Sequence, residues 1–254
     1  MLNSISNSGS LLTWNRPKTP FEMLCVSNDP QRHLISKTYS LLFSDVDLEM
    51  DEKVQYWERV LDIQLSANEW HHIFTFIHKG SLNVLTQENG YKIYSKWYRT
   101  PHVIHKFSPS TSPTCWRCKS ALGTLIHIWW ECPIIQPFWK EVYRIIPLIT
   151  TYSPNFTAAQ FLLHHTSLPY HVYKNSIVLH LINAAKLCIP THWKDTSPPS
   201  ISEWLQRIKR IAEIEDLILQ SLDSPSKFQD KWKCWIRFTD STEFRNLSHH
   251  PASD

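Results

Sequence analysis

Three cysteines and one histidine lie within 18 residues at a spacing that suits one metal ion. They follow the pattern Cys115-x2-Cys118-x8-His127-x4-Cys132. Two cysteines with two residues between them can direct both thiolates to one ion at about 2.3 Å, and the histidine and third cysteine supply the second pair. Three thiolates and one imidazole complete a tetrahedron without an open position, so the spacing predicts a structural zinc site.

The local sequence leaves two other interpretations of these residues open. Free cysteines are among the most buried residues, and His127 stands among apolar neighbours, so a metal-free core is the first alternative. A catalytic pair of Cys132 and His127 is disfavoured, because no orienting carboxylate or oxyanion donor accompanies it. For the zinc site, we expect Thr124 to cap a short helix that presents His127 and ends near Cys132.

The stretch from Asn89 to Trp130 contains no aspartate or glutamate and six lysines and arginines. Its formal charge is therefore +6, against +3 for the whole chain, and aromatic residues alternate with the cations. Cations neutralise phosphates and aromatic faces stack on unpaired bases, so this acid-free window predicts binding of RNA or single-stranded nucleic acid. The candidate contact residues are Trp116 for stacking and Lys96, Arg99, Lys106, Arg117 and Lys119 for phosphate. The alternative is a solvated basic face over core tryptophans.

Positions within the motif predict how its tryptophans and Arg117 are exposed. Trp116 and Arg117 lie inside the first cysteine loop, where deep burial is not expected. Trp129 and Trp130 are adjacent on a helix and point about 100° apart, so we expect one in the core and one exposed. Trp139 is expected to pack in the core.

The block CWRC…GTLIHIWWECPIIQPFWKEVYRII resembles the cysteine-rich region near the C-terminus of the reverse-transcriptase protein of LINE-type non-LTR retrotransposons. That family reads C-W-R-C, then G-T-L-x-H-x-W-W-x-C, then Q-P-x-W, and all these letters are present here. The resemblance is close over residues 30–147 and looser to residue 240. It implies a segment that binds RNA with little sequence preference and supports target-primed reverse transcription. The family's four ligand positions correspond to Cys115, Cys118, His127 and Cys132.

The catalytic residues of that family have no counterpart in this sequence. A reverse transcriptase holds two metal ions with a pair of adjacent aspartates and a third well upstream. Asp45 and Asp47 are the nearest match, but one residue separates them and only 44 residues precede them. The resemblance therefore implies a non-catalytic fragment that follows the catalytic domain. The alternatives are a structural or protein-interaction domain that docks on the polymerase domain, suggested by an apolar stripe at 201–218, and a transposon relic without cellular function.

Apolar residues recur at helical spacing along most of the chain, which predicts an all-α fold. We expect an irregular helical bundle, as one unit or two subdomains, with a small CCHC zinc-knuckle-like insert. Capping boxes at Ser66–Glu69 and Ser200–Glu203 mark two strong helix starts. Pro147 is expected to end a helix. Further helices are expected within residues 31–43, 50–65, 84–98, 101–106, 133–146, 171–188 and 225–238.

The expected organisation has five parts. They are an irregular lead-in at 1–30, a helical region at 31–110, the cysteine-rich region at 111–147, a C-terminal helical region at 148–240 and a disordered tail at 241–254. No signal peptide and no run of about 18 apolar residues is present, and the other cysteines are few and scattered. We therefore expect an intracellular protein, cytoplasmic or nuclear, that has neither a membrane nor a small-molecule substrate as partner.

Overall fold

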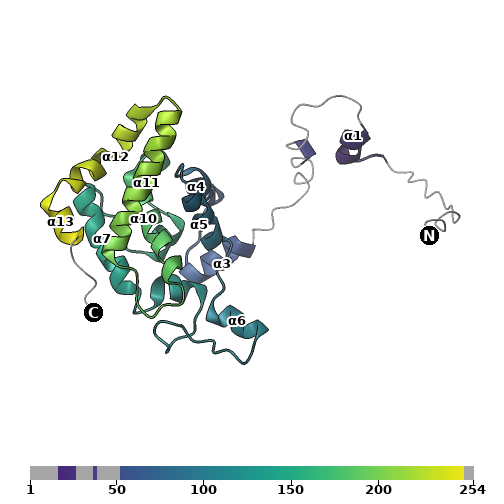
Figure 1. Ribbon diagram of the computed structural model, residues 1–254. Coiled ribbons are helices and arrows are strands. Elements are labelled where there is room, and N and C mark those ends of the chain that lie inside the picture. Colours follow the sequence, from purple (N-terminus) through teal and green to yellow (C-terminus); the bar gives the residue numbers. More distant parts are fainter. Residues whose placement is uncertain (1–16, 27–36, 39–51, 249–254) are drawn as a thin grey trace, which may run out of the picture. The chain divides into compact units, whose positions relative to one another are not determined.

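The computed structural model describes residues 17–26, 37–38 and 52–248. All regular elements in these residues are helices, which confirms the all-α prediction (Figure 1). The chain divides into two units, Met1–Glu52 and Lys53–Asp254. The expected helix at 31–43 and the aspartates at 45 and 47 lie outside the described residues, apart from helical residues 37 and 38.

A short helix, α1 (Pro20–Val26), lies within the expected irregular lead-in, so that prediction is wrong at these residues. Thr19 and Glu22 explain why the helix starts here. The Glu22 backbone N–H donates to Thr19 Oγ1 at 3.2 Å, and the Thr19 N–H donates to Glu22 Oε2 at 2.8 Å. This reciprocal pair is a capping box with proline at the first helical position.

The second unit contains the segment Cys115–Cys132, called the knuckle below, and the helices on either side of it. Before the knuckle come α3 (Glu52–Leu61), α4 (Ala67–Lys79), α5 (Val84–Tyr94) and α6 (Pro101–Phe107). The knuckle includes a π-helix (His127–Glu131). After the knuckle come α7 (Gln136–Ile149), α8 (Ala158–Leu163), α9 (Tyr170–Lys174), α10 (Ile177–Cys188), a 3-10 turn (Pro190–His192), α11 (Ile201–Ser221), α12 (Pro225–Thr239) and α13 (Thr242–Ser248). The three predicted regions between residues 53 and 240 thus belong to one compact unit.

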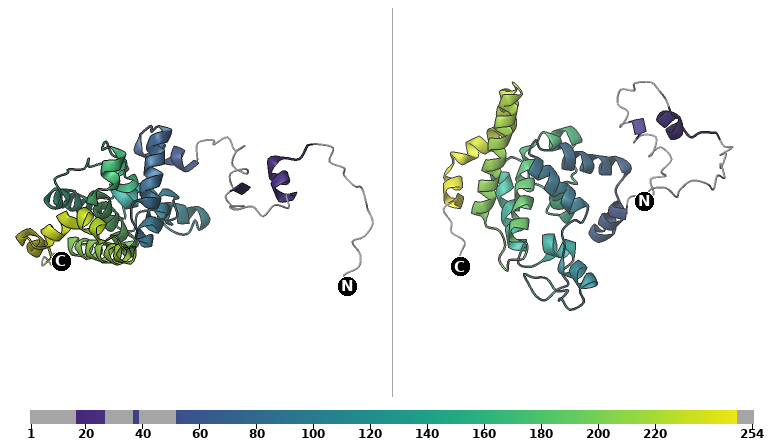
Figure 2. Two further views of the ribbon diagram at one scale, coloured as in Figure 1. Left: turned by 90° about the horizontal axis from the view of Figure 1, so that it is seen from above. Right: turned by 45° about the vertical axis from the view of Figure 1, so that its right-hand side comes forward.

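Helix α10 forms the centre of this unit. Its sequence is apolar on nearly all sides, and every residue of α10 except Leu187 is buried, as expected for a helix enclosed by others. It lies beside α11 in Figures 1 and 2 and also contacts α5, α7 and α12. The Trp204 indole N–H donates to the Leu181 carbonyl at 2.9 Å, which satisfies the polar edge of a fully buried ring.

Both predicted capping boxes are present, at Ser66–Glu69 and Ser200–Glu203. Four predicted helices differ in extent. The helix expected within 50–65 spans only Glu52–Leu61. The helix expected at 84–98 ends at Tyr94, because Lys96 adopts a left-handed conformation with φ of 56°. The helix expected at 171–188 is interrupted before Ser176, whose side chain caps α10.

Pro147 does not end α7, which starts three residues later than expected and continues to Ile149. A proline in the last turn removes one helical hydrogen bond but keeps the helical φ. The end of the helix is stabilised instead by Thr150. Its backbone N–H and hydroxyl both donate to the Ile146 carbonyl, at 2.9 and 3.1 Å.

The tail expected to be disordered contains α13, so the prediction is wrong for residues 242–248. The Phe244 ring packs edge-on against Trp235 and Phe238 of α12, with centroids 5.8 and 5.7 Å apart. Burial of an aromatic side chain fixes this helix to the unit. Residues 249–254 lie outside the described part. No helix among the described residues has the length and apolar character needed to cross a membrane.

Candidate metal centre

The first two candidate ligands lie in a tight turn between α6 and the π-helix. The Cys115 N–H donates to the Ala121 carbonyl at 2.8 Å, and the Lys119 N–H donates to the Cys115 carbonyl at 2.9 Å. An antiparallel bridge between Thr114 and Leu122 closes the turn, and Lys119 adopts a left-handed φ of 54°. This turn directs Cys115 and Cys118 to the same side of the chain.

The second pair of ligands is positioned by a π-helix that the sequence pattern did not predict. Thr124 starts the helix as expected, because its hydroxyl accepts from the His127 N–H at 3.2 Å. The Cys132 N–H then donates to the His127 carbonyl at 2.8 Å, five residues back. In an α-helix, residues five apart differ by about 140° around the axis. The wider turn, typical of functional sites, brings His127 and Cys132 onto one face.

The four predicted ligands converge. Their ligating atoms all lie within 4.8 Å of one another. Cys115 Sγ is 3.8 Å from Cys132 Sγ, and Cys118 Sγ is 3.4 Å from His127 Nε2. Cys115, His127 and Cys132 are buried, whereas Cys118 is half-buried. These residues can therefore hold a metal ion, and they are the only such group among the residues that the structure describes.

The two cysteines of the turn differ in acidity. Burial raises the pKa of the Cys115 thiol to about 11, with a smaller contribution from the neighbouring Cys132, although backbone N–H groups of Cys118 and Arg117 oppose the change. Burial also acts on Cys118, but hydrogen bonds from Ser120, Ala121 and His127 outweigh it and lower the pKa to about 5. A thiolate is the form that binds a metal ion, so the turn favours ligation at Cys118.

Arg117 does not face solvent, contrary to the expectation that it contacts phosphate. Its side chain is 5% exposed, and its guanidinium donates to the carbonyls of Ile128 at 2.9 Å and His192 at 3.1 Å. Burial lowers the pKa of Arg117, and the nearby charges of Cys115, Cys132 and Asp195 oppose this change. Its guanidinium group binds carbonyl oxygens inside the protein and is not available to a phosphate in this structure.

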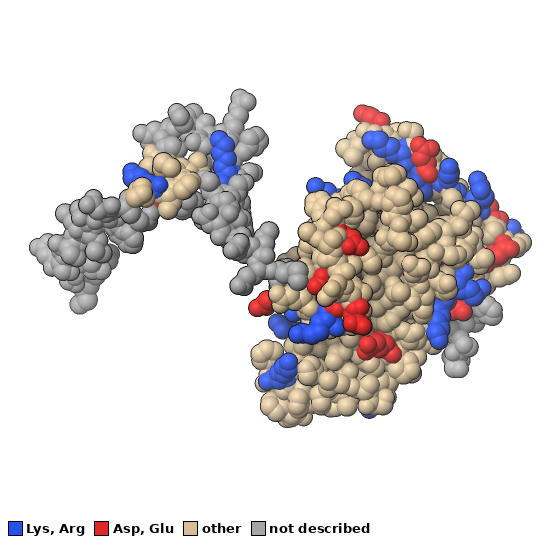
Figure 3. Space-filling view, turned by 180° about the vertical axis from the view of Figure 1, so that it is seen from behind, with Lys and Arg blue, Asp and Glu red and all other residues tan. Residues whose placement is uncertain are grey.

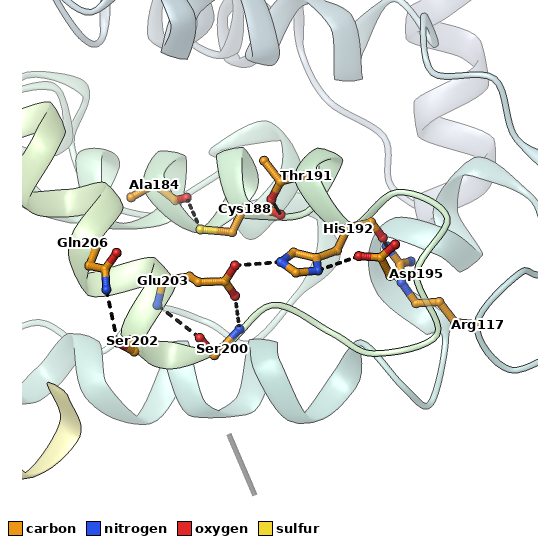
Figure 4. Close-up of polar contacts among 10 residues, drawn as sticks. All are labelled: Arg117, Ala184, Cys188, Thr191, His192, Asp195, Ser200, Ser202, Glu203 and Gln206. Carbon is orange, nitrogen blue, oxygen red and sulfur yellow. Dashed lines mark hydrogen bonds and ion pairs between the residues drawn. The ribbon is translucent and has the colours of Figure 1, made fainter. Parts of the chain in front are cut away.

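The acceptor of Arg117, His192, joins the knuckle to the start of α11. Figure 4 shows its ring between two carboxylates, with Nε2 at 2.8 Å from Glu203 Oε1 and Nδ1 at 2.9 Å from Asp195 Oδ2. Glu203 also accepts from the Ser200 N–H at 2.7 Å as part of the capping box. The knuckle is thus connected to α11 through a continuous set of polar contacts.

The tryptophans of the motif are more enclosed than expected. Trp116, predicted to face out, is half-buried; its ring lies 6.2 Å from that of Trp193. Trp129 is fully buried, as predicted for one of the pair, but Trp130 is half-buried and packs against Trp139 at 5.7 Å. Trp139 is fully buried, as predicted. The apolar rings therefore form core contacts on both sides of the knuckle.

The remaining predicted contact residues are exposed. They are Lys96, Arg99, Lys106 and Lys119. The acid-free window also exposes three aromatic side chains that were not among the predicted contacts, Tyr91 at 48%, Trp97 at 66% and Phe107 at 80%. Trp97 directly follows the predicted contact Lys96, and Phe107 directly follows the predicted contact Lys106.

Three of the four candidate ligands are buried, and four exposed cations lie in the acid-free stretch of sequence around them. Comparison with models of known protein families gives no match for this sequence.

Proposed function

We propose that this chain is a non-catalytic module that binds RNA or single-stranded nucleic acid and is stapled by a structural zinc ion. The observation that carries the proposal is the set of four exposed cations, Lys96, Arg99, Lys106 and Lys119, in the acid-free stretch of sequence that also holds three of the four candidate ligands. The resemblance to the LINE-type cysteine-rich region supports the same role. In that setting, the module supports target-primed reverse transcription by a polymerase domain outside this segment.

The residues of the knuckle fit zinc in distance. Two sulfurs at about 2.3 Å from a tetrahedral zinc ion lie about 3.8 Å apart, and a sulfur and an imidazole nitrogen lie about 3.5 Å apart. The separations here are 3.8 Å between Cys115 and Cys132 and 3.4 Å between Cys118 and His127. A bound zinc ion supplies no reaction step in this proposal and fixes the fold of the turn.

The residues of the knuckle also suit zinc in their total charge. A divalent ion with three thiolates carries a net charge of −1, and buried charges require compensation. Arg117 is a buried cation that donates to two carbonyls and has Cys115 and Cys132 as its first neighbouring negative groups. The buried guanidinium therefore balances a zinc centre that has three thiolate ligands.

The knuckle holds α6 and its exposed side chains in place. The His102 N–H donates to the Gly123 carbonyl at 3.2 Å, and His105 Nδ1 lies 2.7 Å from the Thr111 carbonyl. Gly123 has no room for a side chain, since a Cβ there would lie 2.6 Å from Pro101. These contacts position Lys106 and Phe107 relative to the metal centre.

Elemental analysis tests the metal. We expect one zinc ion per chain, and we expect Cys118→Ser to lose it together with much of the stability, since structural zinc sites contribute on the order of 10 kcal/mol of apparent binding free energy. Cys25→Ser makes the same substitution at an exposed cysteine outside the ligand set; it is the matched control and retains zinc. A fully folded protein without metal would assign the four residues to an ordinary core.

Salt dependence of RNA binding tests the nucleic-acid role. The double variant Lys106→Gln/Lys119→Gln removes two exposed cations, and each lost phosphate contact on a single strand reduces the slope of log affinity against log salt by about 0.7. Lys227→Gln/Lys233→Gln removes two exposed cations of α12 as a matched control. A knuckle variant with the slope and affinity of wild type would contradict the proposal.

A second candidate function is a structural domain that docks on the polymerase domain. It is favoured by the inward orientation of Arg117 and the half-burial of Trp116. Because of these two features, the first cysteine loop exposes few groups that could contact a ligand. The apolar stripe at 201–218 gives limited support, because Trp204 and Ile208 are buried within the unit while Leu217 is 66% exposed. This candidate predicts that the isolated chain gains thermal stability when the polymerase portion is added.

A further inference from the structure

A groove lies along α11, on the side where α10 ends. Its lining comes from the end of α10, from Thr191 and from successive turns of α11, and its volume is about 470 Å³. The α11 side chains in it are Glu203, Gln206, Arg207, Lys209, Arg210 and Glu213. Figure 4 shows four of its lining residues, Cys188, Thr191, Glu203 and Gln206. We call this concavity the α11 groove.

The three cations of the α11 groove have no carboxylate partner in the described part of the chain. The ion pairs found there include none from Arg207, Lys209 or Arg210. Arg207 is half-buried and interacts with the Cys188 thiol, whereas Lys209 and Arg210 are exposed. Unpaired cations gathered in a concave surface favour an anionic ligand, because the low-dielectric walls strengthen the local potential.

The three cations and two carboxylates of the groove leave it with a formal charge of +1. Both oxygens of Glu203 have other partners, since one accepts from the Ser200 N–H and the other lies 2.8 Å from His192 Nε2. Of the two carboxylates, only Glu213 is exposed. By contrast, basic and acidic side chains are interspersed around a broad uncharged area on the face of the molecule shown in Figure 3.

The α11 groove adjoins the knuckle through the segment that connects α10 to α11. Thr191 lines the groove, and the next residues contact the knuckle: the His192 carbonyl accepts from Arg117, and the Trp193 indole N–H donates to the Arg99 carbonyl at 3.0 Å. Lys194 lies with its ammonium 5.9 Å from the Trp116 ring centroid. The basic surface of the acid-free window is thus separated from the groove by these few residues.

We propose that the α11 groove binds phosphates of the same single-stranded nucleic acid that contacts the knuckle surface, with Arg207, Lys209 and Arg210 as the phosphate contacts. This inference rests on the proposed function and extends it, because it adds a second contact surface from the C-terminal helices. Guanidinium groups suit phosphate oxygens geometrically, and contacts to the backbone do not require a particular base sequence.

The test uses the full chain with zinc bound and a fluorescent oligouridylate as the probe. Lys209→Gln/Arg210→Gln changes only exposed side chains, so its fold is retained, and Lys227→Gln/Lys233→Gln on α12 is the control of equal charge. Loss of two phosphate contacts lowers the salt slope by about 1.4, so affinity lost between about 50 and 200 mM salt becomes about sevenfold smaller. The control variant is expected to keep the wild-type slope.

The outcomes separate this inference from the proposed function. If wild type does not bind the probe, both the inference and the proposed function are wrong. If wild type binds and Lys106→Gln/Lys119→Gln lowers the slope, while the groove variant matches the α12 control, the inference alone is overturned. If the groove variant lowers the slope and the control does not, the inference holds. Combining the groove and knuckle substitutions then lowers the slope by the sum of the two effects, as expected for contacts to one strand.

Discussion

Lys186 gives the chain a pH-dependent stability that can be predicted from its surroundings. The side chain is 1% exposed, and its Nζ lies 2.8 Å from His164 Nε2 and 3.3 Å from the Leu162 carbonyl. No carboxylate neutralises it among the described residues, and burial lowers its pKa to about 7 from 10.5. This difference corresponds to about 5 kcal/mol, which is the free energy that opposes folding when the amine is charged.

The direction in which stability changes with pH follows from which state, folded or unfolded, binds the proton. Below pH 7 the amine is charged in both states, so the full opposing free energy is present. Between pH 7 and 10.5 the unfolded chain binds the proton and the folded protein does not, so stability rises by about 1.4 kcal/mol per pH unit. We therefore expect the wild-type free energy of unfolding to increase between pH 7 and 9 by about 2.5 kcal/mol from this residue.

The variant Lys186→Met removes the ionisable group and keeps a side chain of similar length. Urea unfolding followed by tryptophan fluorescence at pH 6 to 9, with zinc saturating, measures the difference between variant and wild type. We expect Lys186→Met to be the more stable at pH 6, by less than the full amount because the Leu162 carbonyl loses a donor. The advantage shrinks as pH rises. Lys227→Met, at an exposed position, gives a difference that does not vary with pH.

Two results would refute this reasoning. A constant difference between Lys186→Met and wild type from pH 6 to 9 would mean that the pKa of Lys186 is not lowered by burial. A variant less stable than wild type throughout would mean that the hydrogen bonds of the amine outweigh its desolvation. His164 faces the same amine, and burial lowers its folded-state pKa well below 6.5. Its unfolded-state titration near 6.5 contributes to the stability of both proteins and therefore cancels in the difference between Lys186→Met and wild type.

Three further predictions concern buried groups around the core. Arg117→Met, measured with zinc bound, is expected to destabilise the protein by about 3 kcal/mol and to weaken zinc retention against a chelator, because it removes the cation that balances the thiolates. Burial lowers the pKa of His180 to about 4, so stability falls as pH drops from 6.5 to 4, by about 3 kcal/mol; His180→Leu should flatten this decrease in acid unfolding curves. Phe244→Ala should cost about 2 kcal/mol in urea unfolding, half the value for a fully buried phenylalanine, and an unchanged midpoint would mean that α13 contributes nothing.

Local patterns in the sequence predicted the helices and the ligand set well. The capping boxes at Ser66 and Ser200 depend on residues three apart, and the knuckle depends on spacings of two, eight and four residues. Such features are determined within one or two turns of chain. Their geometry could therefore be inferred without knowledge of the distant contacts.

Features that depend on distant contacts were not predictable in the same way. Arg117 was expected to be exposed because it lies inside the first cysteine loop, but its acceptors are a carbonyl 11 residues away and another 75 residues away. The buried carboxylate of Glu215 is similar. It accepts from Ser81 and from the Leu82 N–H, more than 130 residues earlier in the chain. No local pattern distinguishes these residues from ordinary surface charges.

The knuckle is better described as part of the core than as an insert. An insert would contact its neighbours through its two ends, whereas here Arg117 reaches the segment between α10 and α11, and Trp193 of that segment returns to the Arg99 carbonyl. The four candidate ligands and the α11 groove are therefore positioned by shared contacts. Because the same contacts fix Arg99 and the start of α11, the proposed zinc ion would order both proposed phosphate-binding surfaces together with the turn. On this view, the metal acts on nucleic-acid binding through the spacing of these two surfaces and needs no contact with the ligand itself.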